Sequence, residues 1–179
     1  HFQINKGFLQ KPTIVHAVNG VSFSVKESQT LGIVGESGCG KSTLARAIIG
    51  LLSPTAGDVL YHNQSIQSLH ESLAFQKDIQ IIFQDPLASL NPRMTIGDCI
   101  AEPLTRFEPH LTRNQREEKV LQLMNEVGLV PEQLNRYPHE FSGGQCQRIG
   151  IARALISQPK ILVCDEPVSA LDVSIQAQI

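Results

Sequence analysis

The architecture of this chain follows from one loop sequence, Gly35-Glu36-Ser37-Gly38-Cys39-Gly40-Lys41-Ser42-Thr43. It matches the phosphate-loop pattern G-x-x-x-x-G-K-[ST], which is meaningful when a strand precedes it and a helix follows it. The apolar run 31–34 before the loop predicts a short strand. After the loop, apolar residues recur at helical spacing from 41 to 52, which predicts a helix. Both flanks agree with the loop, and together they favour an α/β fold.

The residue types in this loop suit a nucleoside triphosphate. Glycines let the backbone turn inward so that successive N–H groups face one anion, and the helix start adds further donors and its dipole. We expect the Lys41 ammonium to neutralise the β- and γ-phosphates and the Ser42 hydroxyl to reach Mg²⁺. Cys39 lies inside the loop, either as a reactive thiol or as an inert residue that fills space. A glycine-rich turn that binds nothing is the alternative.

The bulk composition indicates one large protein core and excludes several classes of function. The chain has 179 residues, of which 41% are hydrophobic and 18% charged. No apolar run approaches the ~20 residues of a membrane span. A net charge of −2 argues against nucleic acid as a partner. The four cysteines lack C-x-x-C spacing, so we expect no disulfide framework, no zinc site and a reducing cytosol.

The remaining pattern divides the chain into an α/β part and a helical insertion. A half-buried strand is predicted at 21–25, where apolar residues alternate with serines. Further strands are predicted from the short segments 31–34, 58–61, 79–83 and 160–164. Prolines break the middle region, where the best helix starts with a Thr112–Gln115 capping box and stops at Gly128. The expected parts are an N-terminal β part with the phosphate loop at 1–86, an α-helical subdomain at 87–140, and the rest of the core at 141–179.

Two adjacent acids end the last predicted strand. Asp165 and Glu166 follow an apolar run and precede Pro167. Sheets of α/β proteins bind ligands at the carboxyl ends of their strands, and phosphoryl transfer needs a carboxylate near Mg²⁺. We assign Asp165 to Mg²⁺, through a coordinated water, and Glu166 to orienting or deprotonating the attacking water. The alternative is that two acids simply end a strand at the surface.

A second anion-binding pattern opens another predicted helix. Ser142, Gly143 and Gly144 combine a hydroxyl and two glycines with a helix N-terminus, and Gln145 follows them. This tripeptide is common in turns, so the pattern alone is weak. A chain with two phosphate-binding elements suggests that the second one serves a nucleotide held by another subunit.

Taken in the order in which they occur along the chain, the motifs resemble those of the ATP-binding cassette ATPases. Residues 35–43, Gln84, 142–145, 165–166 and 169–172 look like that family's Walker A, Q-loop, signature, Walker B and D-loop. The sequences in and around these motifs are similar to those of the ATPase subunits of oligopeptide and dipeptide importers. That similarity rests on Phe83-Gln84-Asp85-Pro86, Ser89-Leu90-Asn91-Pro92-Arg93-Met94-Thr95, Tyr137-Pro138-His139-Glu140-Phe141-Ser142-Gly143-Gly144-Gln145 and Cys164-Asp165-Glu166-Pro167-Val168-Ser169-Ala170-Leu171-Asp172.

The resemblance implies a RecA-like P-loop core with an N-terminal antiparallel β part and an inserted α-helical subdomain. It also implies a head-to-tail dimer that clamps ATP and Mg²⁺ between Walker A of one subunit and the signature of the other. Gln84 would contact Mg²⁺ and the attacking water and would link the helical subdomain to a membrane permease. Asp172 would work across the dimer seam, and Phe2 is our candidate for stacking on adenine.

The candidate site residues fall into three sets. The catalytic residues are Glu166, Gln84 and Lys41. The metal ligands are Ser42, Gln84 and Asp165. The nucleotide-binding residues are Phe2, Gly35, Glu36, Ser37, Gly38, Cys39, Gly40, Lys41, Ser42, Thr43, Gln84, Ser142, Gly143, Gly144, Gln145 and Asp172.

Three departures from the family pattern bear on activity. Phe141 stands where many relatives have Leu, and Cys146 where a polar or basic residue is common. We expect neither to abolish function. The family's switch histidine should lie some tens of residues beyond Walker B, but the sequence ends at Ile179, and His139 does not replace it. We therefore expect a C-terminally truncated chain that hydrolyses ATP poorly by itself.

These features predict the ATP-hydrolysing subunit of an importer of oligopeptides or dipeptides, peripheral on the cytoplasmic face of the inner membrane. Its partners would be a second ATPase subunit, identical or different, the permease subunits and, indirectly, a solute-binding protein. One alternative is an importer of another small solute, such as nickel or glutathione. A less favoured one is a soluble, non-transport cassette ATPase acting on DNA or ribosomes. A regulatory subunit without turnover is a third, against which Glu166 argues.

Overall fold

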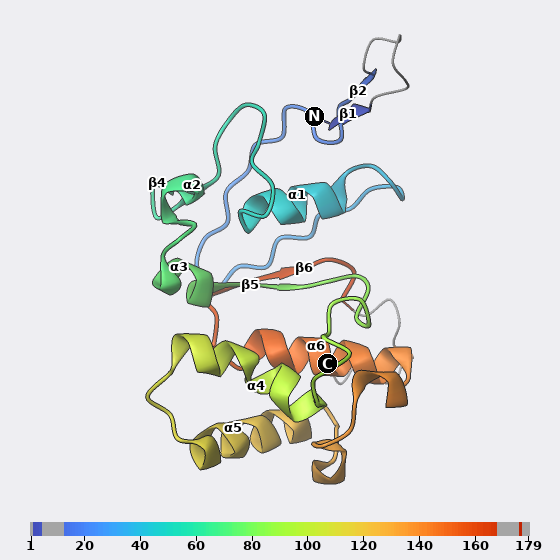
Figure 1. Cartoon of the computed structure of the whole chain (residues 1–179). Coiled ribbons are helices and arrows are strands. Elements are labelled where there is room, and N and C mark those ends of the chain that lie inside the picture. The colour runs from blue at the N-terminus through green and yellow to red at the C-terminus, as the bar shows by residue number, and fades with distance from the viewer. Residues whose placement is uncertain (1, 5–12, 168–175, 177–179) are drawn as a thin grey trace. The chain divides into compact units, whose positions relative to one another are not determined.

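The computed structural model describes residues 2–4, 13–167 and 176 of the chain (Figure 1). These residues gather into two compact units, His1–His70 and Glu71–Ile179. Within the described residues, no helix has both the length and the apolar character needed to cross a bilayer.

The first unit contains the helix that follows the phosphate loop and two small antiparallel hairpins. Its elements are β1 (Phe2–Ile4), β2 (Thr13–Val15), α1 (Lys41–Ile48), β3 (Leu60–Tyr61), β4 (Gln64–Ser65) and α2 (Ile66–Leu69). Strand β1 pairs with β2, and β3 pairs with β4. His62 and Asn63 join β3 to β4 with φ angles of 47° and 62°, as tight two-residue hairpin turns require. The predicted N-terminal antiparallel pairing is therefore present.

Two apolar runs that the sequence predicts as strands are not strands in the structure. Residues 21–25 and 31–34 have no strand partner among the described residues, and their apolar side chains are exposed, Val34 to 93%. The prediction was wrong because a strand needs a neighbour for its backbone N–H and C=O groups, whereas an apolar pattern reports only a preference for burial. Helix α1 also ends at Ile48 instead of continuing to 52, and Gly50 with φ 81° follows it.

The second unit combines a pair of parallel strands with a layer of helices (Figure 1). Its strands are β5 (Ile79–Ile82) and β6 (Ile161–Cys164), paired with Ile79 opposite Ile161. Its helices are α3 (Leu73–Asp78), α4 (Ile96–Phe107), α5 (Arg113–Glu126) and α6 (Gly143–Leu155), with the 3₁₀ turns η1 (Pro131–Gln133) and η2 (Pro138–Glu140). The strands that the sequence predicts at 79–83 and 160–164 are confirmed, each slightly shorter.

Apolar side chains of α4, α5 and α6 form the core of this unit. The fully buried members include Ile96, Ile100, Leu104, Met124 and Ile149. Figure 1 shows α4 beside both α5 and α6, and α6 also contacts β5. This apolar layer is the element that holds the strand pair and the helices together.

The start and the end of α5 are those that the sequence predicts. The Thr112 side chain accepts a hydrogen bond from the backbone N–H of Gln115, and the Gln115 Oε1 accepts one from the backbone N–H of Thr112. Beyond the last turn, Gly128 has φ 72°, the left-handed conformation that ends many helices. The capping box and the glycine stop are therefore confirmed.

The backbone at Leu134 and Arg136, which precedes the signature segment, lies against the first turn of α4. The backbone N–H of Ile96 donates to the carbonyl of Arg136 at 2.9 Å, and that of Gly97 donates to the carbonyl of Leu134 at 3.0 Å. A Cβ at position 97 would lie 2.6 Å from Leu134 Cδ1 and 3.0 Å from the Leu134 carbonyl oxygen, so a side chain there would force the neighbouring segment to shift. A helix leaves the backbone N–H groups of its first turn without partners inside the helix. In α4, two of these groups bind the segment at 134–136 instead.

An ion-pair triad closes the other end of α4. Glu108, which follows the last helical residue, accepts hydrogen bonds from Lys77 at 3.0 Å and from Lys119 at 2.6 Å. Lys77 belongs to α3 and Lys119 to α5, so one carboxylate joins three helices. The hydrogen bond from Lys119, and then that from Lys77, lowers the pKa of Glu108 below its ordinary value of 4.5.

Replacing Glu108 by glutamine should destabilise the chain in a pH-dependent manner. Because the folded-state pKa is lowered, the contribution of this carboxylate is fully present above pH 4.5 and is lost as the pH falls through the folded-state pKa. At pH 7, Glu108→Gln should reduce the free energy of unfolding by up to about 1 kcal/mol, since both lysines are partly exposed. Urea unfolding at pH 7 and at about pH 3 measures this. Glu102→Gln, on the exposed face of α4, is the control, and a difference that stays equal at both pH values would contradict the assignment.

Candidate functional site

The phosphate-loop sequence forms a closed turn at the start of α1. The backbone N–H of Cys39 donates to the carbonyl of Glu36 at 3.2 Å. The Lys41 Nζ folds back over the loop and donates to the carbonyls of Gly35 and Glu36 at 2.9 and 3.0 Å. Within the described residues, the ion pairs involve other lysines and not Lys41. Its positive charge is therefore held at the loop by neutral groups, where a phosphate would be attracted to it.

Glycine is required where this loop meets α1. Gly38 and Gly40 have φ angles of 78° and 102°, a region that residues with side chains rarely adopt. A Cβ on Gly40 would collide with the carbonyl oxygen of Ala17, and one on Gly35 would lie 2.6 Å from the Cys39 Sγ. The loop can close in this shape only because these positions lack side chains.

The start of α1 has the properties of an anion site. Gly40 occupies the position before the helix and supplies no side chain to cap it. Backbone N–H groups at a helix start have no partner within the helix, and the helix dipole adds partial positive charge there. Ser42 and Thr43 lie in this first turn, half-buried, while Glu36 and Ser37 are exposed on the loop. Backbone, dipole and Lys41 thus favour the same ligand, a phosphate group.

In the second unit, the parallel pairing of β5 and β6 brings three candidate residues to one edge. Because both strands run in the same direction, Gln84 after β5 and Asp165 and Glu166 after β6 leave the sheet on the same side. The backbone N–H of Asp165 donates to the carbonyl of Ile82 at 2.9 Å. The Gln84 Nε2 donates to the Glu166 Oε2 at 2.8 Å. Two residues assigned separately from the sequence are thus in direct contact.

The two adjacent acids have different surroundings. Asp165 is 8% exposed, whereas Glu166 is exposed. Glu166 also has φ 51°, a left-handed conformation that costs a residue with a side chain about 1–3 kcal/mol. Strain of this kind is concentrated at functional sites. Here it occurs at the residue that meets Gln84.

The second predicted anion site forms the start of α6. The Ser142 Oγ accepts from the backbone N–H of Gln145 at 3.3 Å, and the Gln145 Oε1 accepts from the backbone N–H of Ser142 at 3.0 Å. This capping box already uses the hydroxyl, so Gly143 and Gly144 present mainly backbone to a ligand. A Cβ on Gly143 would meet nothing of the described chain within 4 Å. The surface beside Gly143 is therefore open to another molecule.

The two unusual residues of the signature segment are accommodated by packing. Cys146 is 1% exposed, its thiol donates to the carbonyl of Pro138 at 3.5 Å, and burial raises its pKa. Phe141 packs against the core of the unit. Both side chains are thus directed into the core of the unit, Cys146 fully and Phe141 in part.

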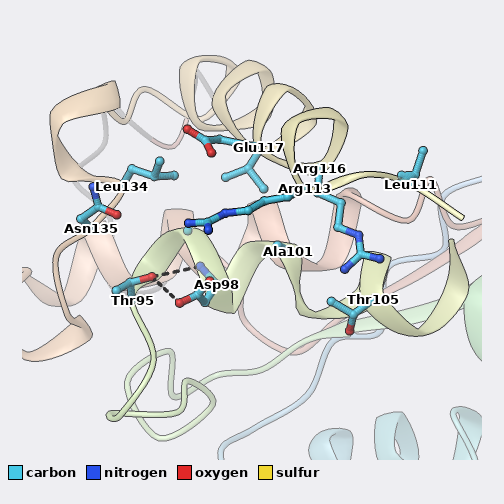
Figure 2. Close-up of a pocket in the computed structure, with 12 residues that line it drawn as sticks. Thr95, Asp98, Ala101, Thr105, Leu111, Arg113, Arg116, Glu117, Leu134 and Asn135 are labelled. Carbon is cyan, nitrogen blue, oxygen red and sulfur yellow. Dashed lines mark hydrogen bonds between the residues drawn. The ribbon is translucent and has the colours of Figure 1, made fainter. Parts of the chain in front are cut away.

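A separate pocket of about 480 Å³ lies beside α4 and α5 (Figure 2). Arg113 and Glu117 of α5 and Asp98 of α4 line it, and Asp98 Oδ2 accepts from Thr95 Oγ1 at 2.9 Å. Charges of both signs are mixed here, and its lining contains none of the candidate nucleotide-binding residues. The pocket therefore lacks the uniform positive charge that would favour a phosphate.

The candidate residues divide between the two units. The loop 35–43 belongs to the first unit, and Gln84, 142–145 and 165–166 belong to the second, where Gln84 and Glu166 meet. Asp172 and the side chain of Phe2 lie outside the described residues. Their roles remain predictions.

Sequence reasoning missed one residue that contacts the segment after Gln84. The Arg153 Nη1 on α6 donates to the carbonyl of Ser89 at 2.6 Å. The available signal was a cation that follows Ile149 and Gly150 at four and three residues, the helical spacing of one face. A single charge on an otherwise apolar helix face indicates a specific partner, but the sequence does not identify that partner.

A glycine-rich phosphate loop at a helix start and acids at the carboxyl end of a parallel strand define a P-loop α/β protein. The sequence pattern of the family described as ABC transporter matches residues 18–169. Because this match covers most of its length, the chain belongs to the ABC transporter family.

Curated relatives of high identity are ATP-binding proteins of peptide transport. The chain is 59% identical over 184 residues to the oligopeptide transport ATP-binding protein OppF of Escherichia coli (strain K12), which covers 100% of this chain and 55% of that protein. It is 62% identical over 174 residues to OppF of Haemophilus influenzae, which covers 96% of this chain and 52% of that protein. It is 52% identical over 181 residues to the di/tripeptide transport ATP-binding protein DppF of Pseudomonas aeruginosa, covering 100% and 56%. The chain spans about half the length of these relatives.

Solved structures of similar fold are ATP-binding cassettes. A dimeric post-hydrolysis state of the cassette MJ0796, bound to ADP and Pi, superimposes with a TM-score of 0.85 and 29% identity, covering 99% of this chain and 76% of that chain. A dimeric structure of MJ0796, described as a bacterial ABC transporter cassette, has a TM-score of 0.83 and 31% sequence identity. It covers 91% of this chain and 71% of that chain. The predicted α/β P-loop cassette fold is thereby confirmed.

Proposed function

We propose that this chain belongs to the ATP-hydrolysing subunit of an ABC importer for oligopeptides or dipeptides. The observation that carries this proposal is the identity of 52–62% to peptide-transport ATP-binding proteins over almost all of the chain. The matched region spans the phosphate loop, the signature and the two acids, because these relatives align with 96–100% of the chain.

In this proposal the loop 35–43 binds the triphosphate of ATP. Its backbone N–H groups and the start of α1 hold the phosphate oxygens, and Lys41 neutralises the β- and γ-phosphates. The support for this is the closed loop, whose shape depends on glycine at 38 and 40, and the Lys41 ammonium held over it. Phe2 is proposed to stack on the adenine.

Glu166 is proposed as the general base for hydrolysis. Its carboxylate accepts a proton from the attacking water, the water oxygen bonds to the γ-phosphorus, and the bond from that phosphorus to the β–γ bridging oxygen breaks to release ADP. Gln84 would orient the same water. The hydrogen bond of 2.8 Å between Gln84 and Glu166 supports this pairing, because it fixes the carboxylate beside the residue assigned to the water.

The oxygen donors of the site fit Mg²⁺. Mg²⁺ prefers one or two protein oxygens completed by phosphate and water, and the described residues contain no cluster of three His, Cys, Asp or Glu that would hold a metal alone. Asp165, with its carboxylate mostly buried, the Ser42 hydroxyl and the Gln84 Oε1 would hold it. When bound, it would neutralise charge on the transferred phosphate.

Catalysis is proposed to need a second cassette. Ser142, Gly143, Gly144 and Gln145 of one subunit would close over ATP bound to the other, and Asp172 would act across the seam. The open surface beside Gly143 and the dimeric state of the MJ0796 cassettes support this arrangement. Closure and reopening of this dimer would drive the permease between its two orientations.

The proposed location is the cytoplasmic face of the inner membrane, with the protein bound peripherally. Its partners would be a second ATPase subunit, the permease subunits and, through them, a solute-binding protein. Transport of another small solute, such as nickel or glutathione, is the nearest alternative. An importer of such a solute would differ from a peptide importer in its permease and its solute-binding protein.

Co-purification tests the transport function. A tagged protein, isolated in mild detergent from the host that produces it, should bring down integral membrane subunits, and its deletion should abolish uptake of labelled tripeptides. Nickel uptake measured in the same strains is the control for solute class. Recovery of ribosomes or DNA in place of membrane subunits would overturn the proposal.

Replacing Glu166 by glutamine should separate binding from turnover. The glutamine keeps an oxygen that accepts the hydrogen bond from Gln84, but it cannot take a proton, so turnover should fall by about 10²–10⁴-fold while ATP affinity stays within a few-fold. Steady-state ATPase rates and equilibrium binding of a fluorescent ATP analogue measure the two. Glu132→Gln, on an exposed turn, is the control. Normal turnover in Glu166→Gln would show that another group is the base.

Thiol labelling tests whether nucleotide occupies the loop. Cys39 is exposed, whereas Cys99 and Cys146 are buried and burial raises the pKa of both thiols. N-ethylmaleimide should therefore modify Cys39 well before these two, and MgATP should slow that reaction by about tenfold or more at saturation. Peptide mapping by mass spectrometry reads each site separately. Equal modification of Cys39 with and without MgATP would contradict nucleotide binding at this loop.

A further inference from the structure

An arginine on the signature helix contacts the segment that follows Gln84. The Arg153 Nη1 donates to the backbone carbonyl of Ser89 at 2.6 Å, although the two residues are 64 positions apart. A hydrogen bond from a charged donor is shorter and about twice as strong as one between neutral groups. Ile149 and Gly150, four and three residues earlier on the same helix, are both buried, so Arg153 continues an apolar helix face.

The same face of α6 lies directly against the segment. A Cβ on Gly150 would come to 4.0 Å from the Ser89 Oγ, so α6 and Ser89 approach closely there. Gln147 lies one turn earlier and is 1% exposed, but neither atom of its amide has a hydrogen-bond partner. Of these polar side chains on α6, Arg153 is therefore the one that holds the segment.

The segment 85–90 is internally bonded and behaves as one piece. The Ser89 Oγ donates to the carbonyl of Pro86 at 2.7 Å, and the backbone N–H of Ala88 donates to the Asp85 carboxylate at 3.0 Å. The backbone N–H of Leu90 donates to the carbonyl of Leu87 at 3.2 Å, and Leu90 is buried in the core. A constraint at Ser89 is therefore transmitted to the start of the segment, next to Gln84.

We propose that Arg153 is a positioning residue, which holds the segment 85–90 on α6 and thereby fixes Gln84 against Glu166. Its guanidinium acts through Ser89 and touches neither nucleotide nor water. The helix that begins with the signature and the segment that carries Gln84 then move together. The effect on hydrolysis rests on the proposed ATPase function, whereas the effect on the segment does not.

Amide hydrogen exchange on the chain 1–179 tests the positioning role directly. Loss of a charged hydrogen bond in Arg153→Met should raise exchange at Ala88 and Leu90 by about tenfold or more. Arg148→Met is the matched control. Arg148, on the same helix, donates to the carbonyls of Val127 and Gly128 at 3.3 and 3.0 Å, so its loss should raise exchange near the end of α5 and leave 85–90 as in the wild type.

The results that overturn the proposal are distinct. Unchanged exchange at 85–90 in Arg153→Met would show that Arg153 contributes only packing through its aliphatic stem. An equal rise there in Arg148→Met would show that the effect is a general loosening of α6 and not the contact with Ser89. Arg153→Lys guards against a variant that fails to fold, because it keeps the charge and an N–H donor group. Its exchange at 85–90 should lie between those of the wild type and Arg153→Met, and a wild-type value would also count against the guanidinium contact.

A kinetic readout separates this inference from the proposed function. In the protein as its host produces it, Arg153→Met should lower kcat for ATP by about tenfold with little change in KM, since Gln84 is displaced while the phosphate loop is not. Arg148→Met should retain the wild-type kcat, and Arg153→Lys should recover part of it. If the wild-type protein hydrolyses no ATP, the proposed function fails while the exchange result still decides the role of Arg153. If ATP is hydrolysed and Arg153→Met keeps a normal kcat, the positioning role fails alone.

Discussion

Parallel pairing of β5 with β6 is the constraint on which the second unit depends. Its register places Ile79 opposite Ile161 and Ile82 opposite Cys164, so the chain leaves both strands at the same edge. Parallel strands need a long crossover, and here α4, α5 and α6 lie between them in the sequence. Gln84 and Glu166, 82 positions apart, meet at 2.8 Å as a direct result. The helical layer and the edge that carries the acids are two consequences of one pairing.

Helix α6 connects the other parts of this unit. Its first residues present the backbone of Gly143 to open space, its apolar residues belong to the core, and its arginines hold the end of α5 and the segment at Ser89. In the proposed dimer, a nucleotide held by the partner subunit would meet this helix at Gly143. The same rigid element would then relate that contact to the position of Gln84.

Sequence reasoning succeeded where a local signal and burial agreed. The Thr112–Gln115 capping box and the stop at Gly128 were predicted because they depend on side chains and φ angles within one turn of chain. The strand predicted from the apolar run at 79–83 is present, because that run is paired with β6 and its ends are buried. The segments 21–25 and 31–34 also carry apolar residues in strand-like patterns, but they have no strand partner among the described residues. Pairing is a property of two segments, which a pattern in one of them does not reveal.

The chemistry of each motif was readable from the order of residues. These motifs are local: they depend on φ angles and on immediate neighbours. They comprise the glycines and the lysine of the loop at 35–43, the helix starts, and the acids after a strand. Tertiary packing alone settled which distant residues meet: Gln84 with Glu166, Arg153 with Ser89, and Lys77 and Lys119 with Glu108. Strand register and helix packing determine these contacts, and both arise from many small apolar contributions spread along the chain.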